Sequence, residues 1–169
     1  SILYKPIISG EENFPRQGPA LFVINHLGDA DGVVAIALSP RPLEFLAKSE
    51  LYDYPILGWL MRAYGMIWVH RGQPDRRALS SAMQGLKQGR LVVIAPEGRE
   101  SITGGLDEGT FGAAYLAYKT GIDIVPVALT NTQNWRLKEN ILHLRKTHIT
   151  VTIGTPFQID IYPDWRMTV

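Results

Sequence analysis

Short apolar runs recur along the chain and predict the strands of a largely buried sheet. They lie at residues 20–25, 43–48, 66–70, 90–95 and 123–129. Nearly continuous hydrophobicity of this kind is typical of strands that are covered on both faces. Residues 148–154 alternate instead, with Ile149, Val151 and Ile153 on one side and threonines on the other. This alternation predicts a strand with one face exposed to solvent.

Segments with the helical spacing of apolar residues separate these runs. Residues 74–89 place apolar side chains at positions 79, 82, 83 and 86, with Asp75 as a predicted N-cap and Gly89 after the last turn. Further helices are predicted over residues 32–39, 54–65 and 110–121. The alternation of strands and helices predicts an α/β fold in which helices cover both faces of a mostly parallel central sheet.

The composition is that of one globular domain. Of the 169 residues, 46% are hydrophobic and 20% are charged, which provides enough apolar material for a core. The net charge of +1 gives no electrostatic basis for binding nucleic acid, so no such partner is expected. The absence of cysteine excludes disulfides, a thiolate nucleophile and a cysteine-ligated metal. We expect residues 1–169 to form a single domain that is the core of a longer chain.

One histidine and two aspartates follow the first apolar run, in the stretch VINHLGDADG. Catalytic groups of α/β folds gather in loops after the carboxyl ends of strands. His26 and Asp31 are five residues apart and would not share a helix face, but a turn at Gly28 would bring them together. The carboxylate could then orient the imidazole as a base. Alternatively, His26 is an ordinary loop histidine and Asp31 only caps a helix.

Charged residues follow two more of the predicted strands. Arg71 comes after an apolar run, where it is either a solvated arginine or a fixed cation for an anionic substrate. The stretch PEGRES follows another buried run. Its Gly98 would let the backbone approach a ligand closely, and Glu97 and Arg99 flank that glycine. Each loop alone is ordinary, but together with the His26 loop they indicate a site at one edge of the sheet.

Four short blocks read N-H-x-x-x-x-D, G-x-x-x-x-x-R, P-E-G and V-P-V, and they lie at Asn25–Asp31, Gly65–Arg71, Pro96–Ser101 and Ile124–Ala128. In this order the blocks resemble those of the glycerolipid acyltransferases. Within that family the chain is most similar to the 1-acylglycerol-3-phosphate acyltransferases. The resemblance covers about residues 8 to 157 and implies a single domain with the fold of that family.

The resemblance also implies roles for individual residues. His26 matches the catalytic base, and Asp31 matches the aspartate that orients it. The positions associated with the glycerol-phosphate acceptor are matched by Arg71, Glu97 and Gly98. Arg99 is the next cation in the motif order and joins them as an expected substrate-binding residue.

The third block departs from the common form of that family, P-E-G-T-R-S. Arg99 stands at its threonine position and Glu100 at its arginine position. The lysine that commonly precedes the next helix is absent from the stretch LDEGTFG, residues 106–112. Glu100 would oppose a phosphate group unless it points away or pairs with Arg99.

The resemblance implies transfer of a fatty acyl group from an acyl thioester, acyl-CoA or acyl carrier protein, to the hydroxyl of a lysophospholipid. The expected acceptor is 1-acylglycerol-3-phosphate, which would give phosphatidic acid. A thiol with a pKa of about 8.5 leaves readily, so the demanding step is activation of the hydroxyl by a base. No further cofactor is expected. No metal is expected either, because His26, Asp29 and Asp31 in one loop match no familiar metal site.

Two alternatives remain open at this point. A hydrolase would direct the same His26–Asp31 pair at water and cleave thioesters without an acceptor. A non-catalytic lipid-binding domain would use residues 54–69, with Trp59 and Trp68, as an apolar surface.

Arg62 interrupts that segment, and no run of about 18 apolar residues is present. We therefore expect a peripheral protein at the cytoplasmic face of a membrane.

Overall fold

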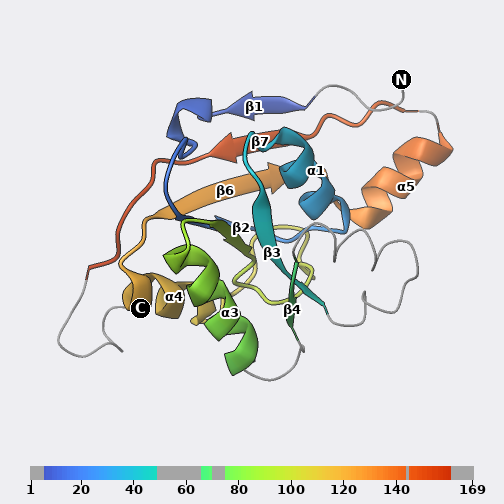
Figure 1. Cartoon of the computed structure of the whole chain (residues 1–169). Helices are drawn as coiled ribbons and strands as arrows, with labels where there is room; N and C mark the ends of the chain where they lie inside the picture. Colours follow the sequence, from blue (N-terminus) through green and yellow to red (C-terminus); the bar gives the residue numbers. More distant parts are fainter. Residues whose placement is uncertain (1–5, 49–65, 70–74, 144, 161–169) are drawn as a thin grey trace.

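The computed structural model describes residues 6–48, 66–69, 75–143 and 145–160 (Figure 1). Its strands are β1 (Ile7–Ser9), β2 (Ala20–Ile24), β3 (Leu43–Lys48), β4 (Ile67–Val69), β5 (Leu91–Ile94), β6 (Ile124–Thr130) and β7 (Thr150–Ile153). Its helices are η1 (Glu11–Asn13), α1 (Ala30–Leu38), α3 (Arg76–Lys87), α4 (Gly112–Thr120) and α5 (Asn134–Leu142). Within these ranges the strands form one seven-stranded sheet in the order β1-β7-β6-β2-β5-β3-β4.

The sheet is mostly parallel, which confirms the prediction from the sequence. Strand β2 pairs in parallel with β5 and β6, and β3 pairs in parallel with β5 and β4. Strands β6 and β7 are antiparallel, and β1 runs parallel to β7 at that edge of the sheet (Figure 1). The carboxyl ends of β2, β5 and β6 therefore share one edge, where the loops that follow these strands come together.

Successive residues of the central strands face opposite sides of the sheet and belong to two separate cores. Leu21 of β2 and Val92 of β5 are buried in one core, whereas Phe22 and Val93 are buried in the other. Because both faces are covered, the strands read as continuous apolar runs rather than as alternating ones.

Helices cover both faces of the sheet, and this confirms the predicted layering. Helix α1 packs Val34, Ala35 and Leu38 against the core that contains Phe22. Helices α3 and α4 pack against the opposite core, to which they contribute Ala82, Leu86, Leu116 and Ala117. The two cores thus lie on the two sides of the central strands β2 and β5.

Helix boundaries follow the local signals at most positions. The Asp75 carboxylate accepts hydrogen bonds from the N–H groups of Arg77 and Ala78 at 3.0 Å each, as expected of an N-cap. Helix α4 ends at Gly121, whose φ of 64° lies in the left-handed region that favours glycine. Helix α1 begins at Ala30, before the predicted range 32–39, so Asp31 lies inside its first turn.

Other elements differ from the sequence pattern or fall outside the described residues. The pattern does not predict β1, η1 or α5. The helix expected over residues 54–65 is not among the described ranges, nor is His70 of the predicted strand 66–70. Across the residues that are described, no helix has both the length and the apolar character needed to cross a bilayer.

Candidate active site

His26 and Asp31 are in direct contact just after the end of β2. The Nδ1 atom of His26 lies 2.9 Å from Oδ2 of Asp31. The same oxygen accepts hydrogen bonds from the backbone N–H groups of Leu27 at 2.7 Å and Gly28 at 2.9 Å. The Asp31 side chain is 1% exposed, whereas that of His26 is 19% exposed. A buried carboxylate that accepts from Nδ1 leaves Nε2 as the basic nitrogen of a partly exposed ring.

The geometry also excludes the reading of Asp31 as a simple helix cap. Asp29 occupies the N-cap position of α1, without a hydrogen bond from its side chain to the helix. The Asp31 carboxylate instead turns back to the loop that precedes the helix and accepts from Leu27 and Gly28. The turn at Gly28 thus brings His26 and Asp31 together, as the spacing predicts.

Asn25 fixes the direction in which the chain leaves β2. Its Nδ2 donates to the carbonyl oxygen of Leu129 at 2.9 Å, and its Oδ1 accepts from the Leu129 N–H at 2.7 Å. Leu129 belongs to β6, the neighbour of β2 in the sheet. Because both hydrogen bonds reach the same residue, the side chain of Asn25 is held in one orientation directly before His26.

The loop after β5 holds the backbone of His26 from the other side. The His26 N–H donates to Oε1 of Glu97 at 3.4 Å, and the His26 carbonyl accepts from the Ser101 N–H at 2.7 Å. Gly98, between these two residues, has a φ of +67°, and no atom lies within 4 Å of the position that a Cβ would take. Glycine is therefore favoured at this position by the left-handed backbone conformation of the turn, and not by a lack of space for a side chain.

Glu97 is a buried carboxyl group beside the base. Its side chain is 5% exposed, and its Oε2 has no hydrogen-bond partner among the described residues. Burial raises the pKa of Glu97 above its ordinary value, and the hydrogen bond from the His26 N–H opposes that shift. The negative charge of Asp107 adds to the upward shift.

The raised pKa of Glu97 leads to a prediction about stability. The folded protein binds this proton more strongly than the unfolded chain, so the stability that Glu97 contributes is present at low pH and is lost as the pH rises through the raised pKa. Replacement with glutamine removes the buried charge and keeps the shape. The new NH₂ group would lie at the buried Oε2 position without an acceptor, and this cost is the same at every pH. We therefore expect the change in Tm caused by Glu97→Gln to be about 1 to 4 °C more favourable at pH 7 than near pH 4.

Thermal unfolding at the two pH values measures this difference. The exposed residue Glu139 provides the control, because Glu139→Gln should leave Tm nearly unchanged at both pH values. A change in Tm of Glu97→Gln that is equal at the two pH values, or less favourable at pH 7, would contradict the prediction.

Arg99 lies in the same loop and pairs with an acid of that loop. Its Nη2 is 3.6 Å from Oδ2 of Asp107, and its side chain is 50% exposed. The pKa of Asp107 is lowered by hydrogen bonds that stabilise its charged form. The hydrogen bond from the Thr103 side chain has the largest effect, followed by those from the Ile102 N–H and the Ser101 side chain. Asp107 is therefore a stable anion that neutralises part of the charge of Arg99.

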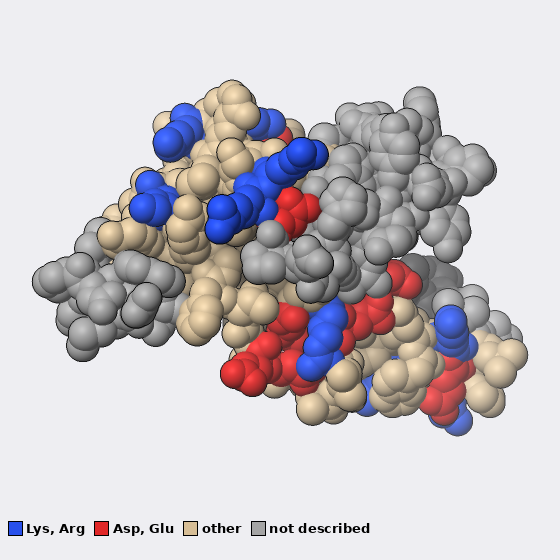
Figure 2. Space-filling model, turned by 90° about the horizontal axis from the view of Figure 1, so that it is seen from below, with Lys and Arg blue, Asp and Glu red and all other residues tan. Residues whose placement is uncertain are grey.

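Negative charge dominates this loop. Residues 97–108 contain four acidic side chains and one arginine. In the view of Figure 2, acidic side chains gather in one part of the face, and basic side chains gather in another. Along the described ranges, no group of three or more histidine, cysteine, aspartate or glutamate side chains is arranged to hold a metal ion.

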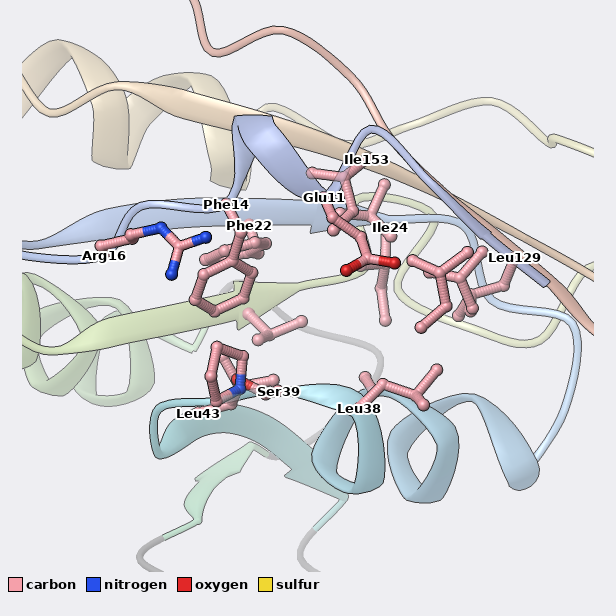
Figure 3. Close-up of a pocket in the computed structure, with 16 residues that line it drawn as sticks. Glu11, Phe14, Arg16, Phe22, Ile24, Leu38, Ser39, Leu43, Leu129 and Ile153 are labelled. Atoms are coloured by element: carbon pink, nitrogen blue, oxygen red, sulfur yellow. The ribbon is translucent and has the colours of Figure 1, made fainter. Parts of the chain in front are cut away.

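A largely apolar cavity of about 280 Å³ lies between α1 and the sheet (Figure 3). Its lining includes Phe14, Phe22, Ile24, Leu38, Leu129 and Ile153, and Figure 3 shows their side chains around the space. Ile24 directly precedes Asn25, and Leu129 is the residue that Asn25 holds. The cavity thus reaches the point where the chain turns into the candidate site.

The structure brings most of the expected site residues to one edge of the sheet. His26, Asp31, Glu97, Gly98 and Arg99 come from the loops after β2 and β5. Arg71 lies outside the described residues. The motifs include Asn25 and Ser101 without indicating their contacts, and they do not include Asn134, which also reaches the His26 loop.

Comparisons with known proteins identify the family of this chain. A family model described as Acyltransferase matches residues 5–130. Over 132 residues, 76% of its length, the chain is 35% identical to the chloroplastic 1-acyl-sn-glycerol-3-phosphate acyltransferase of Arabidopsis thaliana and spans 37% of that protein. Over 126 residues, 73% of its length, it is 36% identical to the lyso-ornithine lipid O-acyltransferase of Pseudomonas aeruginosa and spans 46% of it.

A solved structure shares the fold. The crystal structure of the 1-acyl-sn-glycerophosphate acyltransferase of Thermotoga maritima matches 90% of this chain with a TM-score of 0.74 and 23% sequence identity. The match covers 61% of that protein. The chain thus spans less than two thirds of each of these three relatives.

Proposed function

The chain belongs to the acyltransferase family, and from this premise we propose that it transfers a fatty acyl group from an acyl thioester to the hydroxyl of a lysophospholipid. The observation that carries the proposal is the contact of 2.9 Å between His26 and the buried carboxylate of Asp31. Such a pair provides an oriented base on a partly exposed ring. The names of the two sequence relatives support a lysolipid acceptor.

In the proposed mechanism, His26 acts as a general base. Its Nε2 takes the proton of the acceptor hydroxyl while the hydroxyl oxygen attacks the carbonyl carbon of the thioester. Asp31 stabilises the imidazolium that forms. The tetrahedral intermediate collapses, the carbon–sulfur bond breaks, and the proton passes from His26 to the departing thiolate. Base catalysis of this kind contributes about 10²- to 10⁴-fold to the rate.

The donor is proposed to be acyl-CoA or an acyl carrier protein, without a further cofactor or metal. The cavity beside Ile24 and Leu129 supports a fatty acyl chain as part of the substrate, because most of its lining residues are apolar. Glu11 and Arg16 are the charged residues of that lining. Ile24 lines the cavity two residues before His26, and the carbonyl group of such a chain would need to extend beyond Ile24 to reach the base.

The proposed acceptor is 1-acylglycerol-3-phosphate, with phosphatidic acid as product. Arg71, Glu97, Gly98 and Arg99 are the proposed acceptor residues. A phosphate monoester carries a charge of about −1.5 to −2 at neutral pH, so it needs fixed cations. Arg99 already pairs with Asp107, which makes Arg71 the principal candidate for phosphate binding.

A second acceptor class is favoured by the charge of the site. Asp29 and Glu100 both accept hydrogen bonds from Asn134, and neither forms an ion pair within the described ranges. Glu100 stands where the common block has arginine. Two carboxylates in this position would suit an acceptor that carries a positive group, and one relative is named for lyso-ornithine lipid.

The proposed location is the surface of a membrane at its cytoplasmic face, because the acceptor is a lipid. The apolar segment 54–69, which includes Trp59 and Leu60, is the proposed contact, and its residues 54–65 lie outside the described residues.

The decisive experiment measures transfer of labelled acyl groups from acyl-CoA and from acyl carrier protein to a panel of acceptors. The panel contains lysophosphatidic acid, lyso-ornithine lipid, neutral monoacylglycerol and no acceptor. Product with lysophosphatidic acid supports the first acceptor, and product with lyso-ornithine lipid supports the second. Thioester cleavage that is independent of any acceptor would identify a hydrolase instead. Neither transfer nor cleavage would favour a lipid-binding domain.

Arg71→Lys tests how phosphate is bound. The planar guanidinium can hold two phosphate oxygens at once, and an ammonium group cannot reproduce this geometry. We expect KM for lysophosphatidic acid to rise about tenfold, the equivalent of about 1.4 kcal/mol, while KM for the donor stays nearly constant. Arg99→Ala should have the same effect if Arg99 also binds the phosphate group.

The control for this prediction is Arg145→Lys, at an exposed arginine away from the site. Equal loss with phosphorylated and neutral acceptors in Arg71→Lys would assign Arg71 a structural role.

A further inference from the structure

We propose that Asn134, the first residue of α5, is a positioning residue of the active site that sets the conformation of the loop between His26 and Asp31. The inference rests on the proposed function, because it assigns the residue to the geometry of the same base. It derives from contacts that join three segments far apart in the sequence.

Asn134 holds Asp29, the residue midway along that loop, at two points. The Asp29 N–H donates to Oδ1 of Asn134 at 3.0 Å, and Nδ2 of Asn134 donates to Oδ2 of Asp29 at 3.2 Å. The same Nδ2 donates to Oε2 of Glu100 at 3.2 Å. One amide group therefore connects the His26 loop, the loop after β5 and the start of α5.

Three other backbone N–H groups of the loop, those of Leu27, Gly28 and Asp31, find their acceptors within the loop itself. Leu27 and Gly28 donate to the Asp31 carboxylate, and the Asp31 N–H donates to the Gly28 carbonyl at 3.1 Å. The Asp29 N–H is different, because its acceptor comes from a residue 105 positions away. Glu97 and Ser101 hold the backbone of His26 at the start of the loop, and Asn134 holds Asp29 from outside the loop.

The backbone around Asn134 lies close enough to act on the loop directly. A Cβ on Gly28 would lie 2.6 Å from the Thr132 carbonyl oxygen and 3.0 Å from the Asn134 nitrogen. These are backbone atoms, which cannot turn away as a side chain can. Thr132 itself is completely buried. The backbone of the segment between β6 and α5 therefore packs directly against the His26 loop and leaves no space for a side chain at Gly28.

The chemistry of this position requires an amide. Nδ2 is a neutral donor that can bond two carboxylates, and Oδ1 is the acceptor that the Asp29 N–H needs. An aspartate would keep the acceptor and suit a helix N-terminus, but it would place a third carboxylate beside Asp29 and Glu100. An alanine would remove all three hydrogen bonds. The two substitutions thus disturb the loop in different ways.

The test compares Asn134→Ala and Asn134→Asp in the full chain, with Asn140→Ala as the matched control. Asn140 lies on the same helix and donates to Thr147, away from the site. Because a small displacement of a reacting group has a large effect on rate, we expect Asn134→Ala to lower kcat by about 10- to 100-fold. KM for donor and acceptor should change by less than about threefold, since substrate binding is not removed. The control should keep a wild-type kcat.

A second readout does not depend on activity. Amide hydrogen exchange at Asp29 should become faster in Asn134→Ala, because its N–H loses its acceptor, and should stay unchanged in Asn140→Ala. A third readout is rescue. Asn134→Asp should lower kcat, and adding Glu100→Gln should restore part of it, because the glutamine amide can donate to the new carboxylate.

The outcomes separate this inference from the proposed function. Unchanged Asp29 exchange in Asn134→Ala would overturn the inference, and so would a raised KM at constant kcat, which would make Asn134 a substrate-binding residue. A loss of kcat that only matches the loss of folded protein would overturn it as well. Absence of acyl transfer by the wild-type chain would refute the proposed function, while the exchange data would still test the support of the loop.

Discussion

Replacing His26 with alanine should lower the turnover of acyl transfer by about 10²- to 10⁴-fold while the fold remains intact. The substitution removes Nε2 of His26, the proposed base. The buried carboxylate of Asp31 is not left without hydrogen bonds, because its Oδ2 still accepts from the Leu27 and Gly28 N–H groups. The His26 ring is also partly exposed, so little apolar surface is lost.

Steady-state turnover with a thioester donor and a lysophospholipid acceptor measures the effect, and thermal unfolding checks the fold. His143→Ala is the matched control. His143 is exposed after the end of α5, and its Nδ1 lies 2.9 Å from the carbonyl oxygen of Glu139, away from the site. A folded His26→Ala protein with near-normal turnover would refute base catalysis by this residue.

The strands were predictable because burial on both faces leaves a strong sequence signal. Strands β2, β3, β5 and β6 coincide with the apolar runs to within one or two residues. Strand β7 shows its half-exposed character in the same way, since Val151 is buried and Thr152 is exposed. Strand β1, with only Ile7, Ile8 and Ser9, is too short to produce a pattern of its own. It forms by pairing with β7, at the opposite end of the chain.

Helix α5 escaped prediction because it lacks a clear apolar stripe. Its residues include Trp135 and Leu142, and both are exposed, while most of its other positions are polar. The helix therefore gives neither a core-facing pattern nor a strong start signal. The residue that begins it, Asn134, looks from the sequence like an ordinary loop asparagine.

The candidate site was predictable in its residue types but not in its support. The spacing from His26 to Asp31 and the order of the blocks depend on local sequence, and the structure brings these residues together. The supporting contacts are long-range. Asn25 reaches Leu129, and Asn134 reaches Asp29, across more than 100 residues in each case. Only the pairing of β2 with β6 places these partners side by side.

Replacing Asp31 with asparagine should lower kcat by about 10²-fold or more, even though the shape of the side chain is kept. The side-chain oxygen must stay at the Oδ2 position, because the N–H groups of Leu27 and Gly28 point there. The new NH₂ group then occupies the position of Oδ1, which is buried and has no hydrogen-bond partner among the described residues. His26 keeps a hydrogen bond but loses the negative charge that stabilises its imidazolium during the reaction.

The variant should also cost stability, about 1 to 3 kcal/mol, because the NH₂ group is buried without an acceptor. A double mutant separates the two effects. If Asp31 acts through His26, the protein with both Asp31→Asn and His26→Ala should turn over scarcely more slowly than His26→Ala alone. Kinetics are compared at a temperature at which circular dichroism shows all variants folded. Losses that multiply in the double mutant would mean that the two residues act independently, and Asp31 would then support the loop rather than the base.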